Sequence, residues 1–234
     1  MQTCDQNMEK RVTRMYNRGF LWKLERKLGK IAIRNLMTYI VITMGVVYGV
    51  EVVMQNFSMF SHLVFWTPAI FQGEVWRVIT FIFLPPNAHF IFILFALYFY
   101  YMIGSALENE WGTFKFNVYY LCGVFSSIAA GFIMHAVWGV GFMTNFYLNM
   151  SLFFAFAILY PNFQVRLFLI LPIKVKWLAL LNVAFFVHAL ITGDQFTRIA
   201  ILVSLINLAL FFGKDLFKTI ERWHRKNKFK RSLR

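Results

Sequence analysis

A serine and a histidine in hydrophobic segments are the residues of this sequence best placed to do chemistry. Ser151 and His188 fall in different segments and could in principle face each other. Serine is a weak nucleophile without an adjacent base, and the developing oxyanion needs hydrogen-bond donors, a role open to Asn149. The alternative, which we favour, is that Ser151 bonds a backbone carbonyl and His188 lies in the outer interface of the membrane. No Asp or Glu inside a hydrophobic segment could orient the histidine.

Other hydrolytic chemistries lack the residues that they require. A serine–lysine mechanism needs a lysine within a hydrophobic segment, and the sequence has none there. A metal-dependent hydrolase needs a motif such as H-E-x-x-H, which is absent. The two cysteines have no metal-ligand spacing. We therefore expect no catalytic residue, no metal and no cofactor.

The segment GEVWRVITFIF, Gly73 to Phe83, places an arginine between two long apolar stretches. A guanidinium near hydrocarbon is costly, so Arg77 should have a specific role. One interpretation is interfacial, with Trp76 at the depth of the lipid headgroups and Arg77 extended to a phosphate.

The composition predicts an all-α membrane protein that crosses the bilayer several times. Of the 234 residues 59% are hydrophobic and 15% are charged, whereas soluble domains are about half apolar and about a quarter charged. Six hydrophobic stretches predict spanning helices: Leu36–Met54, Ala88–Leu107, Phe116–Trp138, Phe146–Tyr160, Val175–Ile191 and Thr197–Phe212. The fourth is so short that it needs a thinned bilayer or burial within the bundle.

Two connecting segments are too apolar to be simple loops. Gln55–Thr80 is rich in aromatic residues, and it must dock on the bundle or lie at headgroup depth, because irregular backbone is not tolerated in lipid. Pro161–Lys176 is predicted to be a re-entrant or interfacial link, although it could instead merge with the fourth span. Glu108, Glu110 and Gly112 predict a short polar turn after the second span.

The basic residues predict the orientation in the membrane. All but two of the 24 Lys and Arg residues lie on one side of the predicted spans, the exceptions being Arg77 and Arg198. The positive-inside rule then places both ends in the cytoplasm. This rule, together with attraction to anionic lipid, explains the net charge of +14. A nucleic-acid partner is not required to explain it. We expect a basic amphipathic cytoplasmic segment (1–34), a membrane domain (35–213) and a basic cytoplasmic tail (214–234).

Small residues at helical spacing predict where helices pack closely. Gly45 and Gly49 form such a pair in the first span, and Gly123, Ser127 and Gly131 form a stripe along the third.

The six spans, the Trp-Arg pair in the first loop and the Glu-Gly turn resemble the rhomboid family. The matching residues are Gly73, Trp76, Arg77, Thr80, Glu108 and Gly112. The stretch from Pro161 to Trp177 is also similar to rhomboid-like proteins of Gram-positive bacteria. The resemblance implies a six-helix rhomboid-like bundle in a bacterial cytoplasmic membrane, with the Trp-Arg pair anchoring the first loop against the bundle.

Rhomboids are intramembrane serine proteases, but this sequence lacks their reactive residues. The family has a serine in a G-x-S-G motif on span four, a histidine on span six, and a histidine and an asparagine on span two. Aligned from the Glu108 turn, the span-two positions hold Phe92 and Ala96, and Asn145–Tyr147 has neither Gly nor Ser. The base position on span six holds Ile201. The resemblance is therefore to a pseudoprotease.

Inactive relatives, including derlins, imply binding of transmembrane or membrane-proximal segments of client proteins, in quality control or regulation. A short fourth span and a docked first loop would leave a thinned lateral groove for such a segment. The candidate polar contacts, each of which could instead bond between helices, are Asn149, Ser151, Asn182, Ser204 and Asn207. Two other functions stay open: a rhomboid-type protease with a displaced site, and a small membrane scaffold or transporter. Transport is disfavoured because no span carries a paired carboxylate or a lysine.

Overall fold

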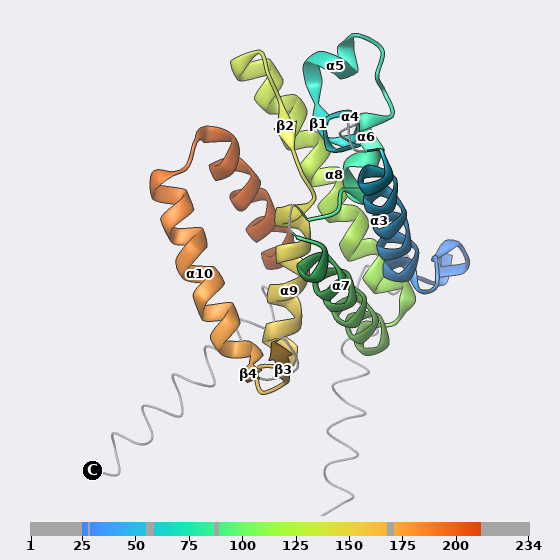
Figure 1. Cartoon of the computed structure of the whole chain (residues 1–234), viewed down its shortest axis with the longest axis vertical. Helices are drawn as coiled ribbons and strands as arrows, with labels where there is room; N and C mark the ends of the chain where they lie inside the picture. The colour runs from blue at the N-terminus through green and yellow to red at the C-terminus, as the bar shows by residue number, and fades with distance from the viewer. Residues whose placement is uncertain (1–24, 28, 55–58, 87–88, 168–170, 212–234) are drawn as a thin grey trace, which may run out of the picture.

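Six long helices form the body of the computed structural model, which describes residues 25–27, 29–54, 59–86, 89–167 and 171–211. Five of them carry labels in Figure 1: α3 (Leu36–Val53), α7 (Phe90–Trp111), α8 (Thr113–Trp138), α9 (Phe146–Leu159) and α10 (Val175–Thr192). The sixth is the Gln195–Phe211 helix. Most of the predicted cytoplasmic segment and the whole of the predicted tail lie outside the described residues.

Four of these helices are long and apolar enough to cross a membrane: α3, in an apolar stretch that begins at Gly29, α7, α8 and α10. Their outward surfaces carry large apolar side chains, such as Tyr39 on α3, Ile91 on α7 and Leu180 on α10. Such surfaces are stable next to lipid and not next to water. The prediction of an all-α membrane protein is confirmed at this level.

The remaining two helices, α9 and Gln195–Phe211, are apolar but shorter. Helix α9 has 14 residues, about 21 Å at the usual rise, and lies at the centre of the bundle, in contact with α7, α8 and α10 (Figure 1). Nine of its 14 residues are buried, from Leu148 to Ala157. A helix that is apolar on all sides is stable only when surrounded. Of the two alternatives for this short helix, burial within the bundle is the one observed.

A glycine makes the turn between α7 and α8. Gly112 has a φ of +83° and ends α7 while it begins α8. Because α7 continues to Trp111, the polar turn predicted at Glu108 and Glu110 is in fact the last turn of the helix. The correction has a physical reason: glutamate favours helix, and the Glu108 carboxylate is satisfied there by a backbone N–H.

The first loop is folded and docked on the bundle, as one of the two alternatives predicted. After Val53 it forms α4 (Met59–Leu63), β1 (Phe65–Trp66), α5 (Thr67–Phe71), α6 (Arg77–Thr80) and the 3₁₀ turn η2 (Phe81–Phe83). Strand β1 pairs antiparallel with β2 (Phe142–Met143), which lies between α8 and α9. The pairing satisfies backbone groups that lipid could not.

The Pro161–Lys176 link is a β-hairpin, which the all-helical prediction missed. Strands β3 (Gln164–Leu167) and β4 (Leu171–Lys174) pair antiparallel at one end of the bundle (Figure 1). The residues before the hairpin also cap α10, because Val175 N donates to the carbonyl of Phe163 at 2.8 Å and Lys176 N to that of Pro161 at 3.1 Å.

Glycine contacts show which of the predicted packing positions are close. On α8, a Cβ on Gly123 would lie 2.4 Å from Leu148 of α9, and a Cβ on Gly131 would lie 2.2 Å from Phe65 of the first loop. The Gly45 and Gly49 pair does not bring another described helix close, since Gly45 has only an ordinary contact and Gly49 none within 4 Å. The close approach between α3 and α7 is made instead by Gly104, where a Cβ would lie 2.3 Å from Met37.

Candidate functional site

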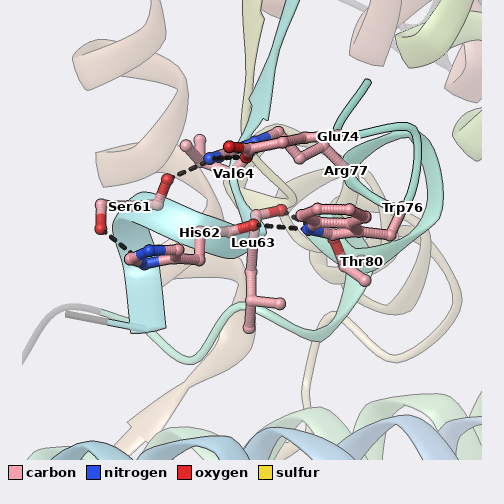
Figure 2. A network of polar contacts seen from close by, with 8 residues as sticks. All are labelled: Ser61, His62, Leu63, Val64, Glu74, Trp76, Arg77 and Thr80. Carbon is pink, nitrogen blue, oxygen red and sulfur yellow. Dashed lines mark hydrogen bonds and ion pairs between the residues drawn. The ribbon is translucent and has the colours of Figure 1, made fainter. Parts of the chain in front are cut away.

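Three side chains of the first loop cap the end of α4 (Figure 2). The carbonyls that they bind are consecutive: Ser61, His62, Leu63 and Val64. Arg77 Nη1 donates to the first at 2.5 Å and to the last at 3.2 Å. Trp76 Nε1 donates to the second at 3.3 Å, and Thr80 Oγ1 to the third at 3.1 Å. The last carbonyls of any helix lack partners within the helix. The side chains of Trp76, Arg77 and Thr80 supply the missing hydrogen-bond donors at the end of α4.

The charge of Arg77 is buried and compensated. The residue is 4% exposed, and its Nε donates to a Glu74 carboxylate oxygen at 2.5 Å, with Nη2 in ion-pair contact with the same oxygen. Gly73, with a φ of +110°, makes the turn that precedes Glu74. A positive helix-capping group is also favoured by the dipole at a helix C-terminus.

These contacts revise the two interpretations of the pair. Trp76 is half exposed, but Arg77 is buried and hydrogen-bonded within the loop, so it does not extend to a lipid phosphate. The contacts of Trp76, Arg77 and Thr80 join α6 to α4, and thus fix the loop internally.

The loop is held against the bundle by Thr67, which sequence reasoning missed. Its side chain is fully buried. Its hydroxyl lies 2.9 Å from His135 Nδ1 on α8 and accepts from Gly141 N at 2.7 Å. Its backbone N–H donates to the carbonyl of Gly141 at 3.0 Å. A threonine beside the proline of WTPAIF gives no specific signal in sequence, because its partners are about 70 residues away.

Asn145 makes a third connection from the loop to the bundle. Its Nδ2 donates to the carbonyls of Ile82 and Leu84, each at 2.8 Å. It thereby caps the 3₁₀ turn that leads toward α7. Asn145 also begins the stretch that the resemblance from sequence pairs with the nucleophile motif, and its amide binds two backbone carbonyls.

The opposite end of the bundle has its own polar cluster, built on Glu108. This carboxylate is 8% exposed and accepts from Asn35 N at 2.9 Å and from Thr113 Oγ1 at 3.0 Å. Asn117, also missed from sequence, exchanges hydrogen bonds with the backbone of Ile33 at 2.9 and 3.1 Å. Together they hold the beginning of α3 against α7 and α8.

At the same end, α7 is linked to the residue that follows α9. The Tyr160 hydroxyl donates to Glu110 Oε2 at 2.8 Å. That hydrogen bond is the main reason why the pKa of the Tyr160 hydroxyl is raised.

The three positions that the rhomboid resemblance pairs with the family's histidines and asparagine, Phe92, Ala96 and Ile201, hold side chains that cannot transfer protons. Ile201 is fully buried, and Phe92 is 48% exposed on the outer face of α7. Ser151 is buried and donates to the carbonyl of Leu148 at 2.7 Å, while His188 is exposed and contacts Thr192. Within the part of the chain that the structure describes, no hydrogen bond joins Ser151 to a histidine.

Four of the five candidate client contacts are buried inside the bundle: Asn149, Ser151, Ser204 and Asn207. Three of them line one cavity of about 10 Å³ between α8, α9 and the Gln195–Phe211 helix, about the smallest that holds a water molecule. Ser204 Oγ donates to the carbonyl of Tyr147 at 2.8 Å. Neither side-chain polar atom of Asn207 has a hydrogen-bond partner among the described residues.

The fifth candidate, Asn182, lies in a lateral groove. This groove has a volume of about 110 Å³ and is walled by α7, α9, β3 and α10. Its lining is apolar apart from Asn182: Phe95, Phe99, Met150, Phe153, Val165 and Leu178. Asn182 Nδ2 donates to the carbonyl of Leu178 at 3.0 Å, which leaves its side-chain oxygen without a partner among the described residues.

The four long apolar helices, with large apolar side chains on their outward surfaces, define a multi-pass helical membrane protein. No protein-family model matches the chain, and no curated protein matches it.

Proposed function

We propose that this chain is a rhomboid-like pseudoprotease that binds transmembrane or membrane-proximal segments of client proteins. The observation that carries the proposal is the lateral groove between α7 and α10, which presents one unsatisfied amide oxygen at Asn182. The proposal takes the six long helices as six spans in a bacterial cytoplasmic membrane, with both ends in the cytoplasm, as the distribution of Lys and Arg favours.

The groove, at about 110 Å³, has room for one side chain that projects from a client helix. Its phenylalanine and methionine walls match apolar side chains, and methionine adapts to different shapes. A client hydroxyl or amide could donate to Asn182 Oδ1, and such a bond between helices in a membrane is worth about 0.6 kcal/mol on average. So weak a bond favours transient, broad recognition of clients.

The exposure of α10 supports entry of a client segment from the lipid. Of its 18 residues only Val175 and Phe186 are buried, so most of this helix faces outward, and Phe186, against Tyr147 and Phe154, is its buried contact with α9. Movement of α10 away from α7 would widen the groove without disrupting the polar clusters, since none of the residues in those clusters belongs to α10.

Ser151 and His188 have separate partners among the described residues, which supports binding without cleavage. Ser151 donates to a carbonyl of its own helix and Ile201 stands where a base would be. The cleavage alternative requires α9 and α10 to rearrange so that Ser151 and His188 meet.

In-membrane photocrosslinking tests the proposal. A photoreactive amino acid at Leu178, in the groove, should capture client segments in living cells, whereas one at Tyr39, on the lipid-facing surface of α3, should capture lipid. Asn182→Leu should lower capture from position 178, because it keeps the size of the side chain and removes the acceptor. Recovery of lipid alone from both positions would exclude client binding at this groove.

A further inference from the structure

We propose that a second groove, on another face of α10, holds an acyl chain of an anionic phospholipid, with the lipid phosphate bound by Lys176. The groove lies between α9, α10 and the Gln195–Phe211 helix and has a volume of about 430 Å³. This inference does not depend on the proposed client-binding function.

The two grooves lie on different faces of α10. Leu178 and Asn182 line the groove toward α7. Ala179, Val183 and Phe186, at helical spacing, line the second groove. A lipid in the second groove and a client in the first would therefore occupy separate sites.

The shape of the second groove fits a hydrocarbon chain. Its α10 wall runs from Lys176 to Leu190, which is about 21 Å at 1.5 Å per residue. This length exceeds half of a hydrocarbon core of about 30 Å, the share of one leaflet. Apart from Lys176, every lining residue is apolar. A client helix with polar groups would find no partner there, whereas an acyl chain needs none.

The charge at the end of the groove indicates the headgroup. Lys176 is exposed, and no carboxylate of the described residues forms an ion pair with it. Its Nζ lies 5.5 Å from the ring centroid of Trp177, an exposed indole. Tryptophan beside lysine is typical of the depth of the lipid headgroups. The positive-inside rule places this end in the cytoplasmic leaflet, where anionic lipids attract basic residues.

Native mass spectrometry of the full chain, equilibrated with equal amounts of phosphatidylglycerol and phosphatidylcholine of matched acyl chains, tests the site. We expect one retained phospholipid with a preference for phosphatidylglycerol. Lys176→Gln should lower that preference about fivefold, the effect of one basic residue near an anionic surface. Val183→Trp should fill the groove and reduce retention of both lipids.

Two matched variants control for general effects on charge and bulk. Lys30→Gln removes a charge from the same end of the bundle, and Leu181→Trp adds bulk to the opposite face of α10; neither should change retention. Equal retention of the two lipids by the wild-type chain, or unchanged retention in Val183→Trp, would overturn the proposal. Client capture from position 178 should persist in Val183→Trp, so a failure of lipid binding is distinguishable from a failure of client binding.

Discussion

The ring of Phe65, from the first loop, occupies the space that a side chain on Gly131 would need. A Cβ built on Gly131 would lie 2.2 Å from Phe65 Cε1 and 2.8 Å from its Cζ. The ring is fully buried and makes edge-to-face contacts with Phe81 and Phe132, so it has little room to move. The glycine stripe on α8 therefore serves two different partners, α9 at Gly123 and the first loop at Gly131.

Gly131→Ala should detach or strain the first loop. The clash with a ring that cannot shift should cost about 1–3 kcal/mol, the usual range for overpacking. Thermal unfolding in detergent, followed by tryptophan fluorescence, should show a lower Tm. Gly49→Ala is the matched control, because its Cβ meets nothing within 4 Å and alanine favours helix. An equal loss in both variants would mean that helix glycines matter here for another reason.

Arg77→Ala should destabilise the first loop strongly. It leaves the carbonyls of Ser61 and Val64 and the Glu74 carboxylate without their cationic partner. A hydrogen bond from a charged group is worth about 1.5–3 kcal/mol, whereas Glu74, whose side chain is 35% exposed, can be hydrated once the guanidinium is removed. Arg77→Lys should recover only part of the stability lost in Arg77→Ala, because an ammonium cannot reproduce the planar set of donors of a guanidinium. The readouts are Tm and the labelling rate of a cysteine introduced at Val64, which is buried in the native loop.

Arg198→Ala controls for the loss of a positive charge on the same predicted side. Arg198 is exposed and donates to the carbonyl of Ile191, so its removal should change stability by less than about 0.5 kcal/mol. Unchanged Tm and unchanged labelling in Arg77→Ala would show that the capping contacts of Arg77 contribute nothing to stability.

The positions of the long helices could be predicted from sequence because they are determined locally, by the length of each hydrophobic stretch and by the glycine or proline at its limits. The third predicted span ends at Trp138 and the fifth begins at Val175, as α8 and α10 do. Glycine and proline mark these limits without reference to the rest of the chain.

The polar contacts between segments could not be predicted, because their partners are distant backbone groups. Asn145 and Asn117 bind carbonyls 61 to 84 residues away, and nothing in their own neighbourhood specifies which. The closest approach of α3 to α7 was not predicted from the glycine spacing for a related reason. Gly45 and Gly49 have the right spacing, but close approach depends on the facing surface, and α7 supplies it at Gly104.

Asn207→Leu should stabilise the protein, which is the opposite of what the loss of a buried polar contact usually does. Both polar atoms of its side chain are buried without a hydrogen-bond partner among the described residues. An apolar side chain of similar size removes that desolvation cost, about 1–3 kcal/mol. Asn117→Leu is the contrast. Asn117 Nδ2 donates to two carbonyls, so this variant should lower the free energy of unfolding by a similar amount. If both variants lose stability alike in thermal unfolding, a water molecule in the adjoining cavity satisfies Asn207.

Ser151 should be inert toward serine-hydrolase reagents. The residue is 1% exposed, and its hydroxyl donates to the carbonyl of Leu148, which directs the proton away from any base. A fluorophosphonate probe should leave the purified full chain unlabelled, and a generic rhomboid substrate should remain intact. Ser151→Ala should behave like the wild-type chain in both assays, because no described histidine accepts from the Ser151 hydroxyl. Labelling of the wild-type chain that disappears in Ser151→Ala and in His188→Ala would instead establish a displaced protease site, formed when α9 and α10 rearrange.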